Sequence, residues 1–479
     1  MQNSSRRFHV AKKIKNRKSP NLEQKSKISF WRGFAKTVFR YPATFFKYIS
    51  LENYHRLVHA IRTEPPGLIL QNFKNLLTRT KHLNTNDIQQ HINNFINKIR
   101  LSNDKKTVLF VTHEVTRTGA PLIILRLAKD MAAHHNINPV FLTCRGGDMA
   151  ADFSKFAPTY HIVHGNDHHT MRQELDHLIK QLRQKTGVQF VYVNSVESRQ
   201  VLPFLHKNGI EHVITLIHEL GFYYPKNAWK IIDDHSDKII FPANFVRDLA
   251  IANTPFATSK IVVRGQGLLK PEILDADQES CRKKIRKELA LPPDSLIVLG
   301  CGATIARKGI DVFVTTAIST LNRLKNASVY FIWLGDGDFN LYKLWTQRDI
   351  DQSGWKKNIR FIGSRKDTIP YFAGSDIFFM TSKGDPFPCV VHEALAAELP
   401  VVGFNNAGGF VDLMDEEQLA PYGDVGAITN ILYKLCTDNE YRRLKSEDSK
   451  KKIESWNFKD YSNFVYQLGD ELINCRVVS

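Results

Sequence analysis

From residue 107 onward, short apolar runs alternate with longer segments whose apolar residues recur at helical spacing. The run 107–112, TVLFVT, is typical of a strand buried on both faces. Similar runs predict strands at 107–112, 139–144, 190–193, 212–217, 238–241 and 260–263, and the segments between them predict helices at 121–133, 171–186 and 202–208. Strands that alternate with helices in this way predict a parallel sheet.

The alternation stops at a charged, proline-containing stretch, 270–295, which includes an expected surface helix at 282–289, and then begins again. Here we expect strands at 296–301, 329–334, 359–361, 377–380 and 400–403, and helices at 310–324, 368–373, 392–397, 427–436, 440–454 and 459–472. The sequence therefore predicts an α/β fold with two Rossmann-like, doubly wound domains, 101–270 and 271–455, that face a central cleft. We expect 456–479 to form a helix that crosses back to the first domain.

Residues 1–100 precede this pattern and differ from it in charge. They contain 20 Lys and Arg against 4 Asp and Glu, whereas the remaining residues contain 46 against 44, so most of the net charge of +18 lies in this basic extension. We expect 1–29 to be disordered and 68–100 to form two short amphipathic helices. Residues 30–51 combine aromatic with basic side chains, which suits a helix on an anionic membrane surface. A helix packed on the body of the protein or on a partner explains the same pattern, and nucleic acid is the less favoured ligand.

The cysteines and the lengths of the apolar segments indicate the compartment. None of the six cysteines forms a CxxC pair or lies near a histidine at metal-ligand spacing, and Cys144, Cys301, Cys389 and Cys436 occur in apolar runs. No segment resembles a signal peptide or approaches the roughly 20 apolar residues of a membrane-spanning helix. We therefore expect a cytoplasmic protein with reduced thiols, either free or peripheral on the inner face of the membrane.

Two loops between strand and helix contain candidate anion-binding groups, because ligands of open parallel sheets bind at the carboxyl ends of strands. The loop 113–121 ends in Gly119, Ala120 and Pro121 at a helix start, where free N–H groups can face an anion. A tight turn with a helix cap remains the simpler explanation of this loop. The loop 302–311 contains Arg307 and Lys308, and cations at a helix start are unfavourable without an anion beside them. Here we favour a bound diphosphate over a solvated basic loop.

Three further positions allow a functional or a structural interpretation. Glu393 lies near a helix start, where its carboxylate can accept two hydrogen bonds from a ribose diol or merely complement the helix dipole. His218 follows a strand of the first domain, so it faces the cleft either as a functional group or as a satisfied structural histidine. Gly408 and Gly409 follow another strand and either admit a ligand to the backbone or form a flexible turn.

In order and spacing, these segments resemble the retaining glycosyltransferases of family 4, which have the GT-B fold, over about residues 107–470. The family's Glu-x7-Glu pattern, which ends in EAxAxGxPVV, is represented by Asp385 and by 393–402, EALAAELPVV. The segment 307–311, RKGID, resembles its KGxD loop. His218 resembles a histidine of its N-terminal domain, and 119–121, GAP, resembles its glycine loop.

This resemblance implies that Asp385, His218, Arg307 and Lys308 are the catalytic residues. Arg307 and Lys308 would neutralise the diphosphate as it leaves, while Asp385 and His218 would contact the transferred sugar from opposite domains. Glu393 would hold the ribose hydroxyls. The remaining donor-binding groups would be the backbones of Gly119 and Ala120 near the phosphates, and the amides after Phe387, at Val390 and Val391, and around Gly408 and Gly409 near the sugar.

The implied reaction moves a sugar from a nucleoside diphosphate sugar to a polysaccharide, glycolipid or lipid-linked acceptor. We expect no metal and no other cofactor, because the two cations and the helix N-termini can stabilise the leaving diphosphate. The sequence departs from the family at Ala303, where an arginine is frequent, and at Asp385, which is one methylene shorter than glutamate. Two other functions remain open: a nucleotide-sugar-binding protein with a degenerate site, and a GT-B epimerase that rearranges the nucleotide sugar itself.

Overall fold

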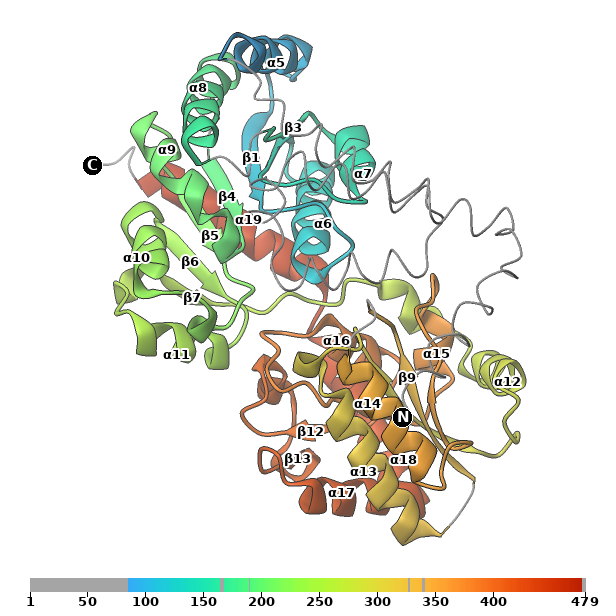
Figure 1. Ribbon diagram of the computed structural model, residues 1–479. Helices are drawn as coiled ribbons and strands as arrows, with labels where there is room; N and C mark the ends of the chain where they lie inside the picture. Colours follow the sequence, from blue (N-terminus) through green and yellow to red (C-terminus); the bar gives the residue numbers. More distant parts are fainter. Residues whose placement is uncertain (1–84, 164–167, 189, 326–327, 338–340, 476–479) are drawn as a thin grey trace, which may run out of the picture. The chain divides into compact units, whose positions relative to one another are not determined.

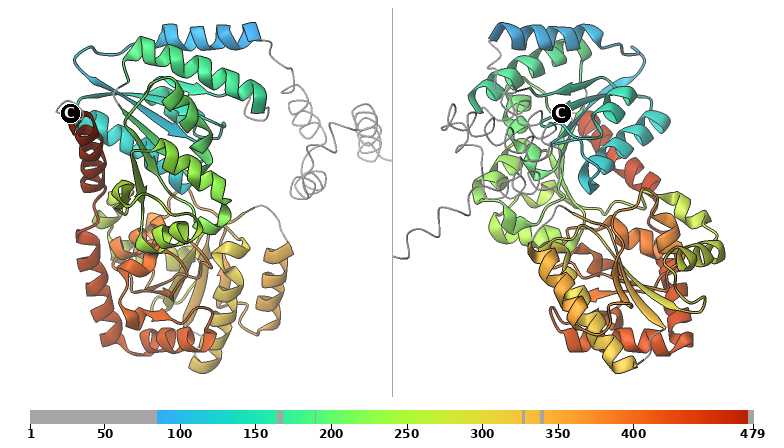
Figure 2. Two further views of the ribbon diagram at one scale, coloured as in Figure 1. Left: turned by 90° about the vertical axis from the view of Figure 1, so that its left-hand side faces the viewer. Right: turned by 45° about the vertical axis from the view of Figure 1, so that its right-hand side comes forward.

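The computed structural model describes residues 85–163, 168–188, 190–325, 328–337 and 341–475. Segments 1–29 and 30–51, with the part of 68–100 that precedes Thr85, lie outside these ranges. Helix α5 (Thr85–Lys98) buries Ile88, Ile92 and Ile96 at helical spacing. It packs along α8 (His168–Thr186), and Figure 2 shows these two helices side by side.

The first sheet is parallel, with the strand order β3–β2–β1–β4–β5–β6–β7. Its strands are β1 (Lys106–Thr112), β2 (Ile137–Thr143), β3 (Thr159–His161), β4 (Phe190–Asn194), β5 (Val213–Leu216), β6 (Lys238–Phe241) and β7 (Ile261–Val263). In β1, Leu109 pairs with Val140 on one side and with Val191 on the other. All three side chains are buried, as expected for a parallel sheet covered by helices on both faces.

Helices cover the two faces of this sheet in separate groups. Helices α6 (Gly119–His134), α7 (Ala150–Phe156) and α19 (Phe458–Cys475) contribute to one core with Phe110, Phe141 and Tyr192 of the sheet. Helices α8, α9 (Leu202–Lys207) and α10 (Lys226–His235) contact one another in succession. Figure 1 shows α6 and α8 on opposite sides of β1.

The second sheet is also parallel, with the order β10–β9–β8–β11–β12–β13. Its strands are β8 (Leu296–Cys301), β9 (Val329–Leu334), β10 (Ile359–Phe361), β11 (Ile377–Phe379), β12 (Val401–Phe404) and β13 (Leu419–Ala420). One group of contacting helices comprises α13 (Ile310–Leu324), α14 (Leu341–Gln352) and α17 (Val425–Thr437). The other helices around this sheet are α12 (Gln278–Glu288), α15 (Ile369–Ala373), α16 (Cys389–Ala396) and α18 (Asn439–Glu454).

Two segments connect the sheets, and they lie side by side. The N–H group of Leu268, after β7, donates to the carbonyl of Trp456 at 2.8 Å, and Leu268 forms a parallel bridge with Asn457. Helix α19 then packs on the first sheet, where the Tyr192 hydroxyl donates to the Val465 carbonyl at 2.8 Å. The chain therefore crosses between the sheets twice, and both sheets belong to one compact unit.

The two Rossmann-like sheets confirm the predicted fold class, and the bounds of β6, β8, β9, β10 and α13 are those predicted. The helix expected at 282–289 begins earlier, at Gln278, because the Asp277 side chain caps it by accepting from the Ser280 N–H at 3.1 Å. That helix is also less superficial than expected, since Arg286 is buried. Elements that the pattern did not predict are α7, α10, α11 (Asn244–Asn253), α14, β3 and β13.

The strand order of each sheet reverses at one position. This switch point lies between β1 and β4 in the first sheet and between β8 and β11 in the second. The loops that leave two such strands turn to opposite faces of the sheet, so they leave a crevice between them. The crevice-forming loops here begin at residues 113, 195, 302 and 380. Three of them contain the expected glycine loop, the Arg307–Lys308 pair and Asp385.

Candidate functional site

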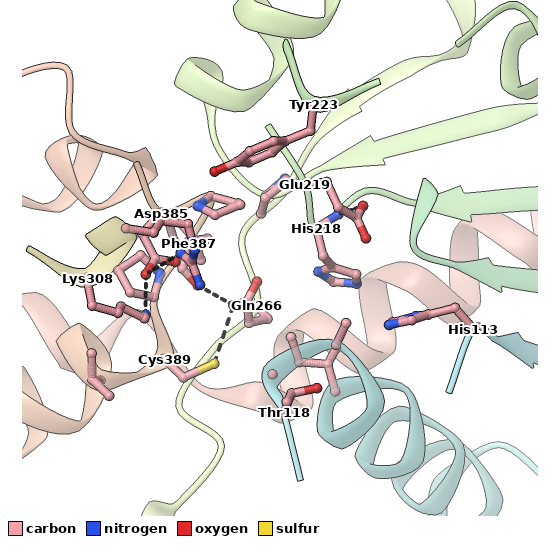
Figure 3. A pocket seen from close by; sticks show the side chains of 18 residues that line it. His113, Thr118, His218, Glu219, Tyr223, Gln266, Lys308, Asp385, Phe387 and Cys389 are labelled. Carbon is pink, nitrogen blue, oxygen red and sulfur yellow. Dashed lines mark hydrogen bonds and ion pairs between the residues drawn. The ribbon is translucent and has the colours of Figure 1, made fainter. Parts of the chain in front are cut away.

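A cavity of about 420 Å³ lies between the loops of the two switch points. Figure 3 shows Lys308, Asp385 and Phe387 on one side of it and His218, Glu219 and His113 on the other. The lining residues are His113, Thr118, Gly119, Ala120, Ile123, His218, Glu219, Tyr223, Pro242, Gln266, Arg307, Lys308, Asp385, Pro386, Phe387, Pro388, Cys389 and Val390. Eight expected site residues are among them: Gly119, Ala120, His218, Arg307, Lys308, Asp385, Phe387 and Val390.

Two cations and one carboxylate form the charged wall of the cavity. The Lys308 ammonium lies 2.5 Å from Oδ2 of Asp385, and an Arg307 guanidinium nitrogen lies 3.3 Å from the same oxygen. The same Arg307 nitrogen donates to the Gly384 carbonyl at 3.1 Å. Arg307 thus reaches the cavity although the family's more frequent arginine position is Ala303. Two positive charges against one negative charge leave this wall with an unbalanced positive charge.

The backbone around this pair is held by close packing. Gly309 ends the short helix η5 (Ala306–Lys308) with φ +70°, and a Cβ there would lie 2.0 Å from the Thr381 carbonyl oxygen. Only glycine fits this left-handed position and the close approach to the loop after β11. The Thr381 hydroxyl also donates to the Lys308 carbonyl at 2.9 Å. The loops after β8 and β11 are therefore tied together, which fixes Lys308 relative to Asp385.

Asp385 is ionised despite its burial. Burial alone would raise the pKa of this carboxyl, but the charges of Lys308 and Arg307, with hydrogen bonds from Lys308 and Ser382, outweigh it and lower the pKa below its usual value. The loop after β12 supports the residue from behind, because the Asp385 N–H donates to the Ala407 carbonyl at 3.0 Å. Asp385 is thus a fixed anion between two cations.

Helix N-termini open onto the same cavity. Gly119 and Ala120 are the first residues of α6, and Cys389 and Val390 are the first of α16; all four line the cavity. A Cβ at Gly119 would meet no atom within 4 Å, so space for a ligand lies beside this backbone. The positive ends of two helix dipoles add to the charge of Arg307 and Lys308. Such a wall suits an anion with several oxygen atoms.

The opposite wall centres on His218, after β5. Its Nε2 atom lies 2.8 Å from Oδ1 of Asn194, whose Nδ2 donates to the Ala120 carbonyl at 3.1 Å. Since Oδ1 is then the acceptor, Nε2 of His218 carries the proton and Nδ1 keeps its lone pair. Burial, reinforced by His113, lowers the pKa of His218 to about 3. His218 is therefore a neutral imidazole.

Glu219 organises the backbone beside His218. Its carboxylate accepts from the Ser195 hydroxyl and, at 3.0 Å each, from the N–H groups of Val196 and His218. Ser195 has φ +82°, a left-handed conformation that is unfavourable for serine and is maintained by these contacts. Burial raises the pKa of Glu219, although the three hydrogen bonds oppose this shift. Glu219 thus holds the loop after β4 in place.

Four expected donor-binding residues do not line the cavity. Val391 is buried, with its N–H donating to the Pro388 carbonyl at 3.0 Å. Glu393 lies one helical turn after Cys389 on α16, and its Oε1 atom lies 3.0 Å from the Lys270 ammonium. The Gly409 N–H group donates to the carbonyls of Asp385 and Pro386. A Cβ on Gly408 would lie 2.1 Å from the backbone carbonyl oxygen of Asp385. In this structure the glycine pair therefore allows close approach to the Asp385 loop.

Several lining residues were not predicted as site residues. Gln266, in the connection between the sheets, donates from Nε2 to the Phe387 carbonyl at 3.1 Å. Cys389 occurs in an apolar run of the sequence, and burial raises its pKa to about 12, so it stays a thiol. Tyr223, which projects from the first-sheet side in Figure 3, is 53% exposed. The sequence did indicate a place near the site for His113, because this residue begins the loop after β1.

The described residues contain neither a cluster suited to a metal ion nor a helix suited to a bilayer. Within those ranges, no three His, Cys, Asp or Glu side chains are grouped in a way that could hold a metal ion. Within the same part of the chain, none of the helices combines the length and the apolar character that spanning a bilayer requires.

Comparison with known proteins identifies the family to which the second sheet is similar. Residues 295–438 match the family model described as glycosyl transferases group 1. The lipopolysaccharide core biosynthesis glycosyltransferase LpsE of Rhizobium meliloti is 29% identical over 232 residues, which are 46% of this chain and 64% of the relative. The processive diacylglycerol alpha-glucosyltransferase of Acholeplasma laidlawii is 28% identical over 233 residues, 46% of this chain and 66% of the relative. Each match spans slightly less than two thirds of the relative's length.

A solved structure extends the likeness to both sheets. The crystal structure of Anabaena HepE in complex with UDP has a TM-score of 0.65 and 15% sequence identity to this chain. The match covers 75% of this chain and 98% of that one. At this identity the likeness establishes the fold alone, and the fold is that of the GT-B glycosyltransferases.

Proposed function

We propose that this protein is a retaining glycosyltransferase that transfers a sugar from a nucleoside diphosphate sugar to a glycolipid, lipopolysaccharide or other glycan acceptor. The observation that carries the proposal is the Arg307–Lys308 pair beside Asp385, in a cavity onto which two helix N-termini open. The family match supports it, because residues 295–438 include this charged wall. The two relatives are named for lipopolysaccharide core biosynthesis and for glucosyl transfer to diacylglycerol, which supports an acceptor of this kind.

Stabilisation of the leaving diphosphate is the proposed task of the charged wall. Negative charge grows on the diphosphate as its bond to the sugar breaks, so fixed positive groups stabilise the transition state more than the ground state. Arg307 and Lys308 are already held in place by Asp385 and by the loop after β11. Little reorganisation is then needed when the diphosphate forms. This chemistry requires no metal, and we propose that the reaction proceeds without one.

His218 and Asp385 are proposed to contact the transferred sugar from opposite sides of the cavity. The Nδ1 lone pair of neutral His218 can accept a hydrogen bond from a sugar hydroxyl, because Nε2 is already engaged with Asn194. Asp385 presents a carboxylate that stays ionised at neutral pH. Residues 101–270 would then form the acceptor side and 271–455 the donor side, with Glu393 holding the ribose.

The test is a screen of nucleoside diphosphate sugars with the full chain, measuring binding by calorimetry and release of the nucleoside diphosphate. UDP-sugars come first, because the HepE structure of the same fold contains UDP. Glycolipid and lipopolysaccharide-core acceptors are then added, and NMR of the product gives its anomeric configuration. Inversion would contradict the retaining assignment, and loss of activity with EDTA would contradict metal independence.

The same screen separates the two alternative functions. Binding of a nucleotide sugar without turnover, with any acceptor, would indicate a binding protein with a degenerate site. Conversion of the donor alone into a different nucleotide sugar would indicate an epimerase. Failure of every nucleoside diphosphate to bind would refute the proposed function altogether.

The basic extension is proposed to hold the enzyme at an anionic membrane, where lipid-linked acceptors are found. The support is the combination of aromatic and basic side chains in the sequence of 30–51. These residues lie outside the described ranges, so the proposal rests on sequence alone. Sedimentation of the full chain with anionic vesicles, against zwitterionic vesicles and duplex DNA at raised salt, tests this proposal. Equal binding to both kinds of vesicle would contradict it, and stronger binding to DNA would favour nucleic acid instead.

A further inference from the structure

Glu393 is held by an ion pair that connects three segments. Lys270 lies in the connection between the sheets, directly before η4 (Pro271–Asp275), and its ammonium is 3.0 Å from Oε1 of Glu393 on α16. The same ammonium donates to the Thr368 hydroxyl, before α15, at 3.0 Å. The Glu393 side chain is 8% exposed and that of Lys270 is 42% exposed. A nearly buried carboxylate thus meets a lysine that is still reachable by solvent.

Glu393 lies close to the part of α16 that lines the cavity. Cys389 lines the cavity, and Glu393 follows it by four residues, so the two share one face of α16 about 6 Å apart along its axis. Glu393 also helps burial to raise the pKa of both Cys389 and Cys301 to about 12, while Lys308 acts on the same thiols in the opposite direction. The carboxylate is therefore one helical turn beyond the N-terminus of α16, which opens onto the cavity.

An ionised carboxylate is required for this role. A ribose diol donates two hydrogen bonds, and the anion accepts both strongly, whereas protonation turns one of its oxygens into a donor. Burial raises the pKa of Glu393, and Lys270 opposes that shift. The thiols that face it, Cys301 from β8 and Cys389 from α16, are neutral at physiological pH because of their high pKa values. Lys270 is thus the cation in direct contact that favours the charged form.

We propose that Lys270 is a positioning residue for the donor nucleoside, which keeps Glu393 available as the acceptor for the ribose diol. This inference rests on the proposed function, which assigns Glu393 to the ribose. Because the ion pair uses Oε1, the lone pairs of Oε2 and the second lone pair of Oε1 are left for the two hydroxyls. Lys270 acts through Glu393 and links the donor site to the connection between the sheets.

The test is calorimetry of UDP and 2′-deoxy-UDP with the full chain, from about pH 6 to about pH 8.5. The Lys270→Met variant removes the charge, and Lys283→Met, on an exposed lysine of α12, is the matched control. We expect Lys270→Met to bind UDP about tenfold or more weakly than wild type at the acidic end, and to recover as the pH rises. The sign follows because loss of Lys270 raises the pKa of Glu393 further, so the anion is lost as the pH falls.

Two comparisons isolate the ribose contact. The ratio of variant to wild-type Kd is the quantity measured, since a terminal phosphate also titrates near pH 6, to the same extent with every variant. Wild type should prefer UDP to 2′-deoxy-UDP at all pH values, whereas Lys270→Met should lose this preference at the acidic end. Lys270→Gln keeps a donor for Thr368 but no charge, so it should behave like Lys270→Met, and Lys270→Arg should behave like wild type.

The outcomes distinguish this inference from the proposed function. If wild type binds UDP but the Kd ratio of Lys270→Met and Lys270→Gln is independent of pH, the inference is overturned and the proposed function stands. The same holds if both variants keep the preference for the 2′-hydroxyl. If wild type binds no nucleoside diphosphate at all, the proposed function is overturned as well.

Discussion

Replacement of Lys308 by methionine tests the charged wall most directly. The substitution keeps most of the side-chain volume but removes the ammonium that lies 2.5 Å from Oδ2 of Asp385, where the two side chains are 17% and 10% exposed. A charge-assisted hydrogen bond in such an environment contributes about 1.5–3 kcal/mol. We therefore expect UDP to bind about 10- to 150-fold more weakly to Lys308→Met than to wild type. Turnover should fall by a further factor of about 100 to 1,000, because charge on the leaving diphosphate is greatest in the transition state.

The assays are calorimetry with UDP and steady-state release of UDP from the best donor in the screen. Lys283→Met, which removes a charge from the exposed surface of α12, should leave both quantities unchanged. Lys308→Arg should retain part of the affinity, since it keeps the charge with a different geometry. Thermal unfolding of each variant shows whether the fold survives, because Lys308→Met leaves the buried Asp385 with Arg307 as its remaining cationic partner.

A double variant separates ligand binding from a purely structural ion pair. Lys308→Met combined with Asp385→Asn removes one charge of each sign, so the net charge of the wall returns to that of wild type. If Lys308 contacts the diphosphate, the double variant should still bind UDP more weakly than wild type, and Asp385→Asn alone at least as tightly. Wild-type affinity in the double variant would show that Lys308 serves only as the counter-ion of Asp385, and would refute the reasoning.

Three further predictions concern ionisation and backbone geometry. The pKa of Asp385 is lowered in the folded state. Its contribution to the free energy of unfolding is therefore present above the unfolded pKa of about 3.9, and it is lost as the pH falls through the folded pKa. Denaturant unfolding should show a constant difference between wild type and Asp385→Asn above about pH 5, and this difference should shrink below about pH 4. Because the pKa of His218 is about 3, its NMR signals should not titrate between about pH 5 and about pH 8, whereas Asn194→Asp should raise that pKa by placing a carboxylate beside Nε2. Gly309→Ala should lower the free energy of unfolding more than Gly423→Ala does. Both glycines have positive φ, but only at Gly309 would a Cβ lie 2.0 Å from the Thr381 carbonyl oxygen. Backbone strain alone costs about 1 kcal/mol, so an equal loss of that size in both variants would show that the contact is harmless.

Elements escaped sequence prediction for physical reasons that differ between them. Helix α14 exposes Leu344 and Trp345 and buries Thr346 and Ile350, so its apolar pattern contradicts its burial and carries no usable signal. Helix α10 is short, but it buries Ala228, Trp229 and Ile232 at helical spacing, so its sequence did contain a detectable signal. The strands were easier to predict, because a strand covered on both faces needs an uninterrupted apolar run.

The residues around the cavity also differ in how far the sequence alone identified them. Arg307 and Lys308 were proposed from their place in a loop between a strand and a helix, and Asp385 from the family resemblance. The strand order then brings the two loops to one cavity. Gln266 and Cys389 were not proposed, because a glutamine in a linker and a cysteine in an apolar run have no distinguishing pattern. The glycine pair was predictable as a close approach of the backbone, yet its partner in this structure is the Asp385 loop.

The sequence by itself determined the two parallel sheets and the loops at their switch points, because alternation of buried strands and amphipathic helices is a local property of the chain. It also determined that unbalanced positive charge would lie beside one of those loops. Only the tertiary structure decided the partners of these groups: Lys308 with Asp385, His218 with Asn194, and Glu393 with Lys270. These contacts join residues from distant parts of the chain, and they depend on packing that no local pattern encodes. The same contacts determine which carboxylates stay charged and which histidine stays neutral in a site of this composition.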